Sequence, residues 1–422
     1  MDKFVVEGEA RLRGTVACAG AKNAALPMMV AALLAPGASR LERVPRLRDI
    51  TTLSRLLETL GAKIVREDDA LILDTTRLAS VEAPYDLVKT MRASVYVLGP
   101  LLARAGRAKV SLPGGCAWGP RPVNLHLKGM EALGARIVIE EGYIVAEAPE
   151  GLRGADILLD IASVGATGNI MMAAVGARGT TRIQNAAREP EMPALAGFLT
   201  AMGASISGAG STEIVIEGGR PLTPATGAVI PDRIEAGTFL VGAALTGGDV
   251  TVTACEPAHL TALVAKLREA GAEVARGEDW LRVAGPARPR AVPVTTDFYP
   301  GFPTDLQAQM MALAAVSEGT SVITEQIYAD RFTHVPELSR LGARITLDQN
   351  VAVVEGQPSL SGARVMATDL RASAALILAG LAAHGETHIS RVYHIDRGYE
   401  RIEVKLAALG AKVRREDEPL VT

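Results

Sequence analysis

Six copies of one short pattern, spaced at intervals of about 70 residues, account for the whole chain and constrain its fold more than any single motif. In each copy the dipeptide Gly-Ala follows a helical segment and precedes a strand-like run, as in LETLGAKI and LAALGAKV. Glycine suits the position just after a helix, because it adopts the left-handed backbone conformation without a steric penalty from a Cβ atom. The six glycines are Gly61, Gly134, Gly203, Gly271, Gly342 and Gly410.

A second helix precedes each copy and is apolar around almost its whole circumference, which predicts that it is buried on all sides. A short strand follows each of these helices, as in GRAKVSLP and GETHISRV. One repeat is therefore expected to contain a buried helix, a strand, a surface helix, the Gly-Ala turn and one or two further strands. The buried helices are predicted at 21–35, 90–105, 165–178, 234–246, 304–318 and 369–384.

Three such repeats that close around their buried helices make one globule, so six repeats make two. The first strand-like run, FVVEG, has no helix before it, and we expect it to pair with the last repeat. One domain is then discontinuous and consists of residues 1–20 with 230–422. The other domain is expected to span 21–229.

Composition excludes several classes of function. The chain has 44 basic and 47 acidic residues and a net charge of −3, so no global field favours nucleic acid or an acidic membrane. Cys18, Cys116 and Cys255 are far apart and lack metal-ligand spacing, which argues against disulfides and zinc. No apolar stretch reaches the roughly 18 residues of a membrane span, and the N-terminus does not resemble a signal peptide. We expect a cytoplasmic protein without a metal.

Polar residues interrupt the apolar texture at the first turn of the buried helices and in the loop after the following strand. Each one alone is consistent with a cap or a solvated turn, but their recurrence favours a site. Helix N-termini attract anions, and arginine binds phosphate and carboxylate bidentately, so the set implies a substrate with at least two anionic groups. Asp305 lies among these cations and is the candidate general base. The cations are Lys22, Arg92, Arg121, Arg331, Arg371 and Arg397.

The segment LPGGCAWGPRPVNLH at 112–126 is the most unusual in the chain. It contains three glycines, three prolines, Cys116 and Arg121. Glycines and a cation beside a cysteine on a loop are the setting of a reactive thiol, and the composition is that of a mobile lid over residues 112–122. A lone cysteine is more often a small buried hydrophobe, and this is the interpretation retained for Cys18 and Cys255.

Several motifs together resemble the bacterial UDP-N-acetylglucosamine enolpyruvyl transferases (1-carboxyvinyltransferases). Among them are AGAKNAALP, LPGGC followed by RPVNLH, FPTDLQAQ, MATDLRAS and YHIDRGYERIE, and the resemblance runs from end to end. It implies an α/β fold of the inside-out α/β barrel type, with two globules of three βαβαββ repeats each and pseudo-threefold symmetry. It also implies the first committed step of peptidoglycan synthesis, in which phosphoenolpyruvate and UDP-N-acetylglucosamine give a 3-enolpyruvyl ether and phosphate, without a cofactor.

The resemblance also implies roles for individual residues. Lys22, Arg121 and Arg397 are expected to hold the phosphate of phosphoenolpyruvate, with Asn23 beside them. Arg331 and Arg371 are expected at its carboxylate. Cys116 would protonate the methylene carbon and be alkylated by fosfomycin, and Asp305 would take the proton of the sugar hydroxyl. The UDP-sugar is expected to contact Asn23, Arg92, Arg121, Pro122, Val123, Asn124, Leu125, Ile161, Ala162, Ser163, Val164, Asp305 and Ile327.

The chain departs from the family pattern at a few positions. Asn124 replaces the usual Asp, and Ile161 and Arg48 stand where Lys is common, while Trp118 and Pro120 are unusual in the lid. Asn124 and Ile161 bear on nucleotide recognition. The alternatives are therefore an enolpyruvyl transferase for another nucleoside or nucleotide sugar, one for shikimate 3-phosphate, and a silent paralogue that only binds UDP-sugar.

Overall fold

The computed structural model describes residues 2–89, 91–112 and 123–417. Internal contacts divide the chain into two compact units. One lies between Gly20 and Ile230 and is called the 20–230 unit. The other, the 231–422 unit, combines Met1–Ala19 with Pro231–Thr422.

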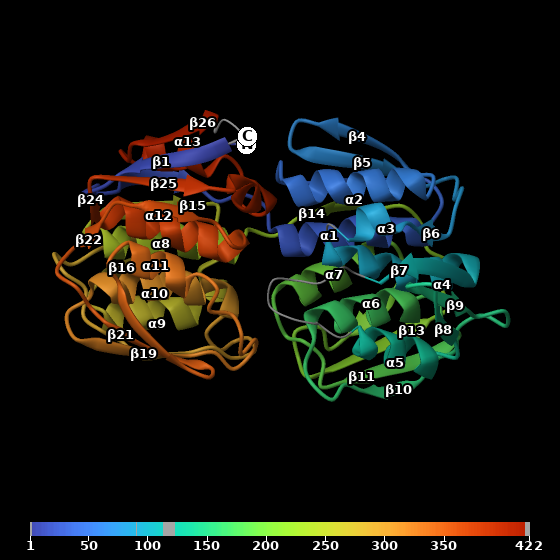
Figure 1. Ribbon diagram of the computed structural model, residues 1–422. Coiled ribbons are helices and arrows are strands. Elements are labelled where there is room, and N and C mark those ends of the chain that lie inside the picture. Colours follow the sequence, from blue (N-terminus) through green and yellow to red (C-terminus); the bar gives the residue numbers. More distant parts are fainter. Residues whose placement is uncertain (1, 90, 113–122, 418–422) are drawn as a thin grey trace. The chain divides into compact units, whose positions relative to one another are not determined.

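Three apolar helices form the interior of the 20–230 unit, and α6 contacts both of the others (Figure 1). The predicted helix at 90–105 is α-helical only from Leu98, after a 3₁₀ segment. Pro100 cannot donate a backbone hydrogen bond and is tolerated in the first turn of an α-helix, which fits this start. The inner helices are α1 (Lys22–Ala31) with η1 (Ala32–Leu34), η2 (Arg92–Val97) with α4 (Leu98–Ala105), and α6 (Val164–Ala174).

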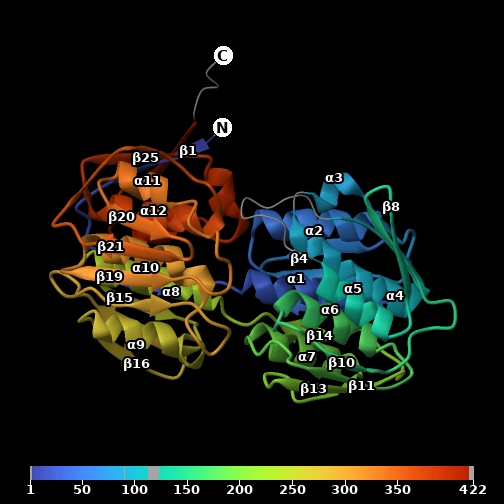
Figure 2. The same cartoon turned by 60° about the horizontal axis from the view of Figure 1, so that its bottom comes forward.

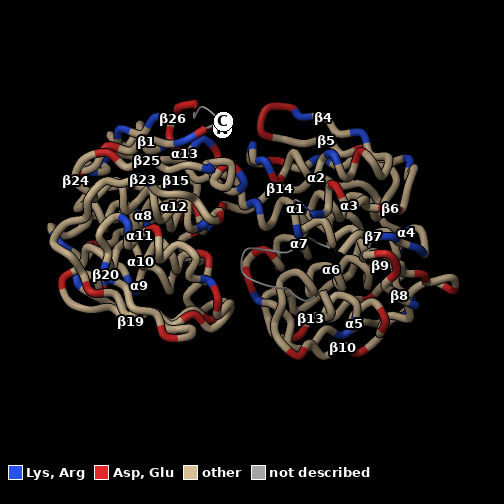
Figure 3. The backbone as a smooth tube through the Cα atoms, in the orientation of Figure 1, with Lys and Arg blue, Asp and Glu red and all other residues tan. Residues whose placement is uncertain are grey.

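The 231–422 unit has the same arrangement, with three inner helices that contact one another in every pair. Charged residues are sparse on these helices and concentrate on the outer elements (Figure 3). This distribution is the one predicted from helices that lack a polar face. The inner helices are α8 (Arg233–Leu245), η4 (Thr304–Leu306) with α10 (Gln307–Val316), and α12 (Leu370–Ala382).

One surface helix in each repeat leads into the Gly-Ala turn. The six glycines of these turns all have positive φ, between 88° and 111°, which confirms the predicted left-handed position after each helix. The surface helices are α2 (Arg48–Thr59), α5 (Asn124–Ala132), α7 (Glu191–Ala201), α9 (Thr261–Glu269), α11 (Val335–Arg340) and α13 (Ile402–Ala408). Short helical segments also occur at α3 (Tyr85–Val88), η3 (Pro257–Leu260) and η5 (Val392–Arg397).

Each repeat ends in a four-stranded mixed sheet in which the strand after the inner helix pairs with a parallel edge strand and with an antiparallel hairpin. In the 20–230 unit the orders are β14 (Thr226–Ala228), β3 (Ala38–Glu42), β5 (Ala70–Asp74), β4 (Lys63–Glu67); β6 (Glu82–Ala83), β7 (Arg107–Ser111), β9 (Tyr143–Glu147), β8 (Arg136–Glu140); and β10 (Asp156–Leu158), β11 (Gly179–Gln184), β13 (Glu213–Gly218), β12 (Ser205–Ser207). Figure 2 shows β10, β11 and β13 of the third sheet side by side.

The sheets of the 231–422 unit repeat this order. They are β2 (Arg13–Ala17), β15 (Asp249–Thr253), β17 (Trp280–Ala284), β16 (Glu273–Arg276); β18 (Val294–Thr295), β19 (Thr320–Thr324), β21 (Val351–Glu355), β20 (Arg344–Asp348); and β23 (Arg364–Met366), β25 (Glu386–Ser390), β1 (Asp2–Glu7), β26 (Val413–Asp417). The short strands β22 (Leu360–Ser361) and β24 (Ala383–His384) form a separate parallel pair.

The N-terminal strand completes the last repeat. In the other repeats the two hairpin strands follow each other along the chain, but β26 is the last described strand, and β1 takes the place of its hairpin partner. Phe4 is opposite Ile389 of β25 and Arg415 of β26, and its side chain is fully buried. The expected pairing of FVVEG with the last repeat is therefore present.

The 20–230 unit closes by a different device. The strand β14 follows the third repeat along the chain and pairs in parallel with β3 of the first repeat. The predicted α/β fold of six repeats, with apolar helices inside and sheets outside, is confirmed. Within the described residues, no helix is both long and apolar enough to cross a bilayer.

Candidate active site

Asp305 lies between two arginines in the 231–422 unit. It belongs to η4, the 3₁₀ turn that precedes α10, while Arg331 follows β19 and Arg371 lies in the first turn of α12. Arg331 Nη1 is 2.8 Å from Asp305 Oδ1, and Arg371 donates to Oδ2 from Nη2 at 2.8 Å and from Nε at 3.1 Å. Three residues predicted separately from the sequence are thus brought together by elements of two consecutive repeats.

The electrostatics of this triad differ from those of an isolated carboxylate. Burial alone would raise the pKa of Asp305, but the charges and hydrogen bonds of Arg371 and Arg331 outweigh it and hold that pKa well below its usual range. Burial likewise opposes the charge of Arg371, but the Asp305 carboxylate outweighs it and raises the guanidinium pKa. Asp305 is therefore ionised at neutral pH.

The guanidinium of Arg371 also has an unused donor. Among the described residues, its Nη1 has no hydrogen-bond partner although it is buried. The Tyr399 ring lies 5.5 Å from the guanidinium carbon and supports it as a cation–π partner. A buried donor of this kind is costly unless a ligand occupies it, and an anionic oxygen is the group that fits.

The other predicted residues of this unit lie on neighbouring segments. Arg397 ends η5, two residues before Tyr399, and is half-buried. Ile327 is in the loop between β19 and Arg331, where its amide donates to the Glu325 carboxylate at 2.9 Å. The predicted site residues of the 231–422 unit therefore lie in the first turns of inner helices and in the loops after the strands.

In the 20–230 unit, Lys22 and Asn23 begin α1. The Lys22 ammonium is 3.1 Å from Asp49 Oδ2, and the two side chains are only 11% and 5% exposed. The sequence interpretation missed Asp49. The spacing in α2 could have indicated that Asp49 is buried, because Asp49 lies four residues before Leu53, on the face of the helix that packs into the core.

We expect Asp49→Ala to lower the free energy of unfolding by about 3 kcal/mol, because it leaves the buried Lys22 ammonium without this carboxylate. Urea denaturation at pH 7.5 measures the change. The matched control is Asp86→Ala, which removes an exposed lysine–aspartate pair in the same unit and is expected to leave the denaturation midpoint almost unchanged. Equal shifts in the two variants would contradict the prediction.

A second group of predicted residues lies at the starts of η2, α5 and α6. Arg92 begins η2, Asn124 and Leu125 follow the N-cap residue Val123 of α5, and Ile161 and Ala162 lead to Ser163, the N-cap of α6. The Ser163 hydroxyl accepts from the Ala166 amide at 3.2 Å. Val164 is the first residue of α6, and its carbonyl accepts from the Tyr96 hydroxyl at 3.3 Å.

His126 connects these helix starts, and the sequence interpretation missed it. Its Nδ1 is 3.0 Å from the amide nitrogen of Asn169, which makes Nδ1 the acceptor and Nε2 the protonated nitrogen. Its Nε2 faces Gly165 in the first turn of α6, where an added Cβ would lie only 3.0 Å away. The RPVNLH motif contains His126, so its place in that motif was the available signal.

Acid is expected to destabilise the protein through His126. Burial, followed by the charge of Arg92, lowers the pKa of His126 from 6.5 to about 4. The unfolded chain therefore binds a proton between these two values that the folded protein does not. With respect to His126, the free energy of unfolding is therefore highest above pH 6.5. It decreases by up to about 3 kcal/mol as the pH falls towards 4.

Urea denaturation at pH 7.5 and pH 5 measures this loss in the wild type and in His126→Gln. The variant should lose less stability between the two pH values. His334, in the 231–422 unit, has a pKa lowered to about 4 by burial and contributes in the same direction in both proteins. His384→Gln, at an exposed position, is the control and should behave as the wild type does. If His126→Gln lost as much unfolding free energy between pH 7.5 and pH 5 as the wild type, His126 would not be the source of the acid sensitivity.

Three of the predicted residues, Cys116, Arg121 and Pro122, lie outside the described residues, as do the lid residues Trp118 and Pro120. Cys18 and Cys255 are buried, and burial raises the pKa of each thiol. Their interpretation as small buried hydrophobes is confirmed.

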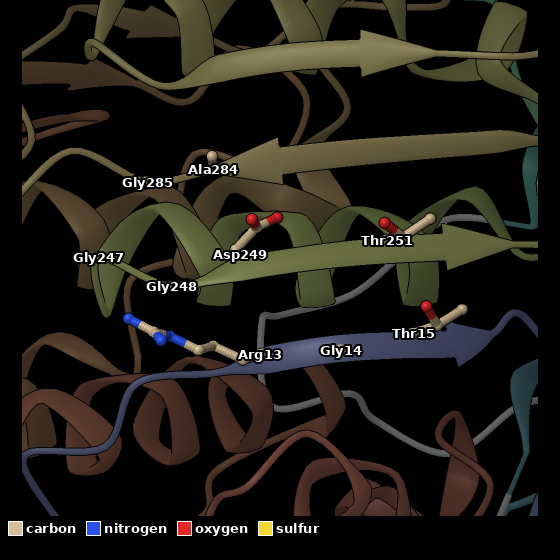
Figure 4. Close-up of a pocket in the computed structure, with 9 residues that line it drawn as sticks. All are labelled: Arg13, Gly14, Thr15, Gly247, Gly248, Asp249, Thr251, Ala284 and Gly285. Atoms are coloured by element: carbon tan, nitrogen blue, oxygen red, sulfur yellow. The ribbon is translucent and has the colours of Figure 1, made fainter.

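A surface depression of about 570 Å³ lies in the 231–422 unit, along β2 and β15 (Figure 4). Its lining contains none of the predicted site residues, and Asp249 within it pairs with the exposed Arg282. The lining residues are Arg13, Gly14, Thr15, Gly247, Gly248, Asp249, Thr251, Ala284 and Gly285.

Known sequences similar to this chain share a chemistry. Residues 6–406 match the family model described as EPSP synthase (3-phosphoshikimate 1-carboxyvinyltransferase). The chain is 57% identical over 419 residues to the UDP-N-acetylglucosamine 1-carboxyvinyltransferase of Trichlorobacter lovleyi, a match that covers 99% of this chain and all of the relative. It is 56% identical over 421 residues to the protein of the same name from Myxococcus xanthus, again over 99% of this chain and all of the relative.

Solved structures resemble it along their whole length. The enolpyruvyl transferase NikO from Streptomyces tendae superposes with a TM-score of 0.89 at 27% identity, over 99% of both chains. An EPSP synthase from Acinetobacter baumannii gives a TM-score of 0.76 at 19% identity, over 99% of this chain and all of the other. The second likeness shows the fold alone.

Proposed function

Because this chain belongs to the EPSP synthase family of 1-carboxyvinyltransferases, we propose that it transfers the enolpyruvyl group of phosphoenolpyruvate to the 3-hydroxyl of UDP-N-acetylglucosamine. This reaction is the first committed step of peptidoglycan synthesis. The observation that carries the choice of acceptor is the 57% identity, over the full length of both chains, to a relative named for UDP-N-acetylglucosamine.

The reaction is an addition followed by an elimination. A proton adds to the methylene carbon of phosphoenolpyruvate, and the sugar oxygen bonds to the adjacent carbon as its own proton leaves. Loss of a proton from the methyl carbon and departure of phosphate then restore the double bond. Positive charge develops at the reacting carbon, and negative charge on the leaving phosphate, so the protein needs an acid, a base and fixed cations.

In the 231–422 unit, Asp305 fits the role of base. It is ionised, and Arg331 and Arg371 hold both of its oxygens. The same two arginines are proposed to bind the substrate carboxylate, and the unused Nη1 of Arg371 supports this assignment. Arg397 is proposed at the phosphate, and Ile327 at the UDP-sugar.

In the 20–230 unit, Lys22 and Asn23 are proposed at phosphoenolpyruvate, since both stand at the first turn of α1, where backbone N–H groups also favour an anion. The helix starts around His126 are proposed to bind the UDP-sugar. Cys116 is proposed as the acid that protonates the methylene carbon, and Arg121 as a phosphate ligand. The proposed UDP-sugar residues of this unit are Asn23, Arg92, Arg121, Pro122, Val123, Asn124, Leu125, Ile161, Ala162, Ser163 and Val164.

Shikimate 3-phosphate is the alternative acceptor that the name of the family suggests. The solved EPSP synthase is 19% identical to this chain, whereas the relative named for UDP-N-acetylglucosamine is 57% identical. UDP-N-acetylglucosamine is therefore the favoured acceptor. A silent paralogue that only binds UDP-sugar differs from the proposed enzyme in that it releases no phosphate.

Phosphate release from phosphoenolpyruvate tests the proposal. The purified protein is given UDP-N-acetylglucosamine, shikimate 3-phosphate or no acceptor, each with and without fosfomycin. We expect release only with UDP-N-acetylglucosamine, and its loss with fosfomycin. Phosphate release with shikimate 3-phosphate alone would overturn the proposed choice of acceptor. No phosphate release with any acceptor would indicate a protein that only binds UDP-sugar.

A further inference from the structure

Glu325 is a buried carboxylate to which no role has been given, and two hydrogen bonds through Thr304 connect it to the Asp305 triad. It directly follows β19 and is fully buried. Within the described part of the chain it forms no ion pair with a lysine or arginine, and polar groups of the protein surround it instead. A buried carboxylate without a cation is costly, so its retention needs a reason.

Four donors converge on this carboxylate. Oε1 accepts from the Thr296 hydroxyl at 2.7 Å and from the amides of Ile327 and Tyr328 at 2.9 and 3.0 Å. Oε2 accepts from the Thr304 hydroxyl at 2.9 Å. An ionised carboxylate only accepts hydrogen bonds, so four donors match its chemistry. Glu325 thereby connects the residue after β18, η4 and the loop that contains Arg331.

The Thr304 hydroxyl connects Glu325 to the triad by two hydrogen bonds. It donates to Glu325, and it accepts from Arg331 Nη1 at 2.8 Å. The same Nη1 is 2.8 Å from Asp305 Oδ1. Because the single hydroxyl hydrogen of Thr304 points to Glu325, its lone pairs are left for Arg331. The carboxylate of Glu325 thus fixes the direction of the chain of hydrogen bonds that ends at Asp305.

We propose that Glu325 is a positioning residue for the transfer reaction, and that it acts through Thr304 on Arg331 and Asp305 and through backbone amides on the loop of Ile327. The inference rests on the proposed function, because it gives Asp305 and Arg331 their roles in that reaction. Glu325 itself touches no reacting group. Loss of its bond to Thr304 alone should therefore lower kcat, while the Michaelis constant for UDP-N-acetylglucosamine stays nearly constant because the Ile327 and Tyr328 amides keep their acceptor.

Two isosteric threonine variants provide the sharpest test. Thr304→Val and Thr296→Val each remove one hydroxyl bonded to Glu325, but only Thr304 continues to Arg331. Oε1 keeps two amide donors without Thr296, whereas Thr304 is the only described donor to Oε2. We expect kcat to fall about 100-fold in Thr304→Val and less than about threefold in Thr296→Val, at similar thermal midpoints. Thr304→Ser keeps the hydroxyl and should restore kcat to within about threefold.

Glu325→Gln is the direct variant, with the same size and an amide in place of one oxygen. The backbone amides of Ile327 and Tyr328 require an acceptor, so the amide oxygen takes the place of Oε1 and the NH2 group faces Thr304. The NH2 group cannot accept from Thr304, so kcat should again fall by about 30-fold or more. Phosphate release by the full-length enzyme is the assay, with calorimetry of UDP-N-acetylglucosamine binding beside it. Binding should change less than about threefold. If Glu325→Gln does not fold, the threonine pair decides.

The outcomes separate this inference from the proposed function. A wild-type enzyme that is active, with Glu325→Gln or Thr304→Val equally active, overturns the inference and leaves the function intact. Equal losses of kcat in the two valine variants, in proportion to their thermal midpoints, mean that Glu325 only stabilises the fold, which also overturns it. Wild-type protein that releases no phosphate with any acceptor overturns the proposed function and this inference together.

Discussion

Asp305→Asn is expected to lower phosphate release at least about a thousandfold, which corresponds to about 4 kcal/mol of transition-state stabilisation. The amide has the size of the carboxylate but does not take the proton of the sugar hydroxyl. Arg331 and Arg371 are each 2.8 Å from the carboxylate, so the exchange also removes the anion that faces both guanidinium groups.

The design separates chemistry from binding. UDP-N-acetylglucosamine should bind to Asp305→Asn within about threefold of the wild type by calorimetry, because the variant keeps the shape of η4. Asp249→Asn is the matched control, since Asp249 and Arg282 form an aspartate–arginine pair in the same unit that is exposed. It should retain full turnover. A rate near that of the wild type in Asp305→Asn would remove Asp305 as the base.

Cys116→Ser is expected to slow turnover by roughly a thousandfold at pH 7–8 while the protein stays folded. A hydroxyl is a far weaker acid than a thiol with an ordinary pKa of about 8.5, so the proton for the methylene carbon is not delivered. Steady-state rates across this pH range measure the effect. Undiminished activity would remove the proposed acid.

Fosfomycin gives the same prediction a second readout. Mass spectrometry should detect one adduct on the wild type and none on Cys116→Ser. Cys18→Ala is the control, because Cys18 is buried and burial raises its thiol pKa, so this variant should still be labelled once and remain active. Labelling of Cys116→Ser would place the reactive thiol elsewhere.

Much of the fold followed from the repeat pattern. The Gly-Ala dipeptides mark six left-handed turns, each at the end of a surface helix. The more apolar segment further upstream in each repeat is an inner helix, because a helix without a polar face can only be buried. The 3₁₀ segments at η2 and η4 were not predicted. Hydrophobic periodicity over six or fewer residues does not distinguish a tight helix from a wider one.

The candidate site was predicted in part. Positions at helix starts pointed to Arg371 and Asp305, and a loop after a strand pointed to Arg331; the structure brings these three into contact. The roles of all the predicted site residues remain predictions. Asp49, His126 and Glu325 were missed, because a single polar residue on an apolar face gives no indication of the partner that will face it.

The sequence by itself determined the number of repeats, the inner and outer helices, the pairing of the first strand with the last repeat, and the family. These properties depend on local backbone preference and on periodic burial, which are written into consecutive residues. Only the tertiary structure decided that both oxygens of Asp305 are held by arginines, that Lys22 faces Asp49, and that Glu325 reaches the triad through Thr304. Each of these contacts joins residues 20 or more positions apart. Their electrostatic energies depend on distances and burial that no local pattern encodes.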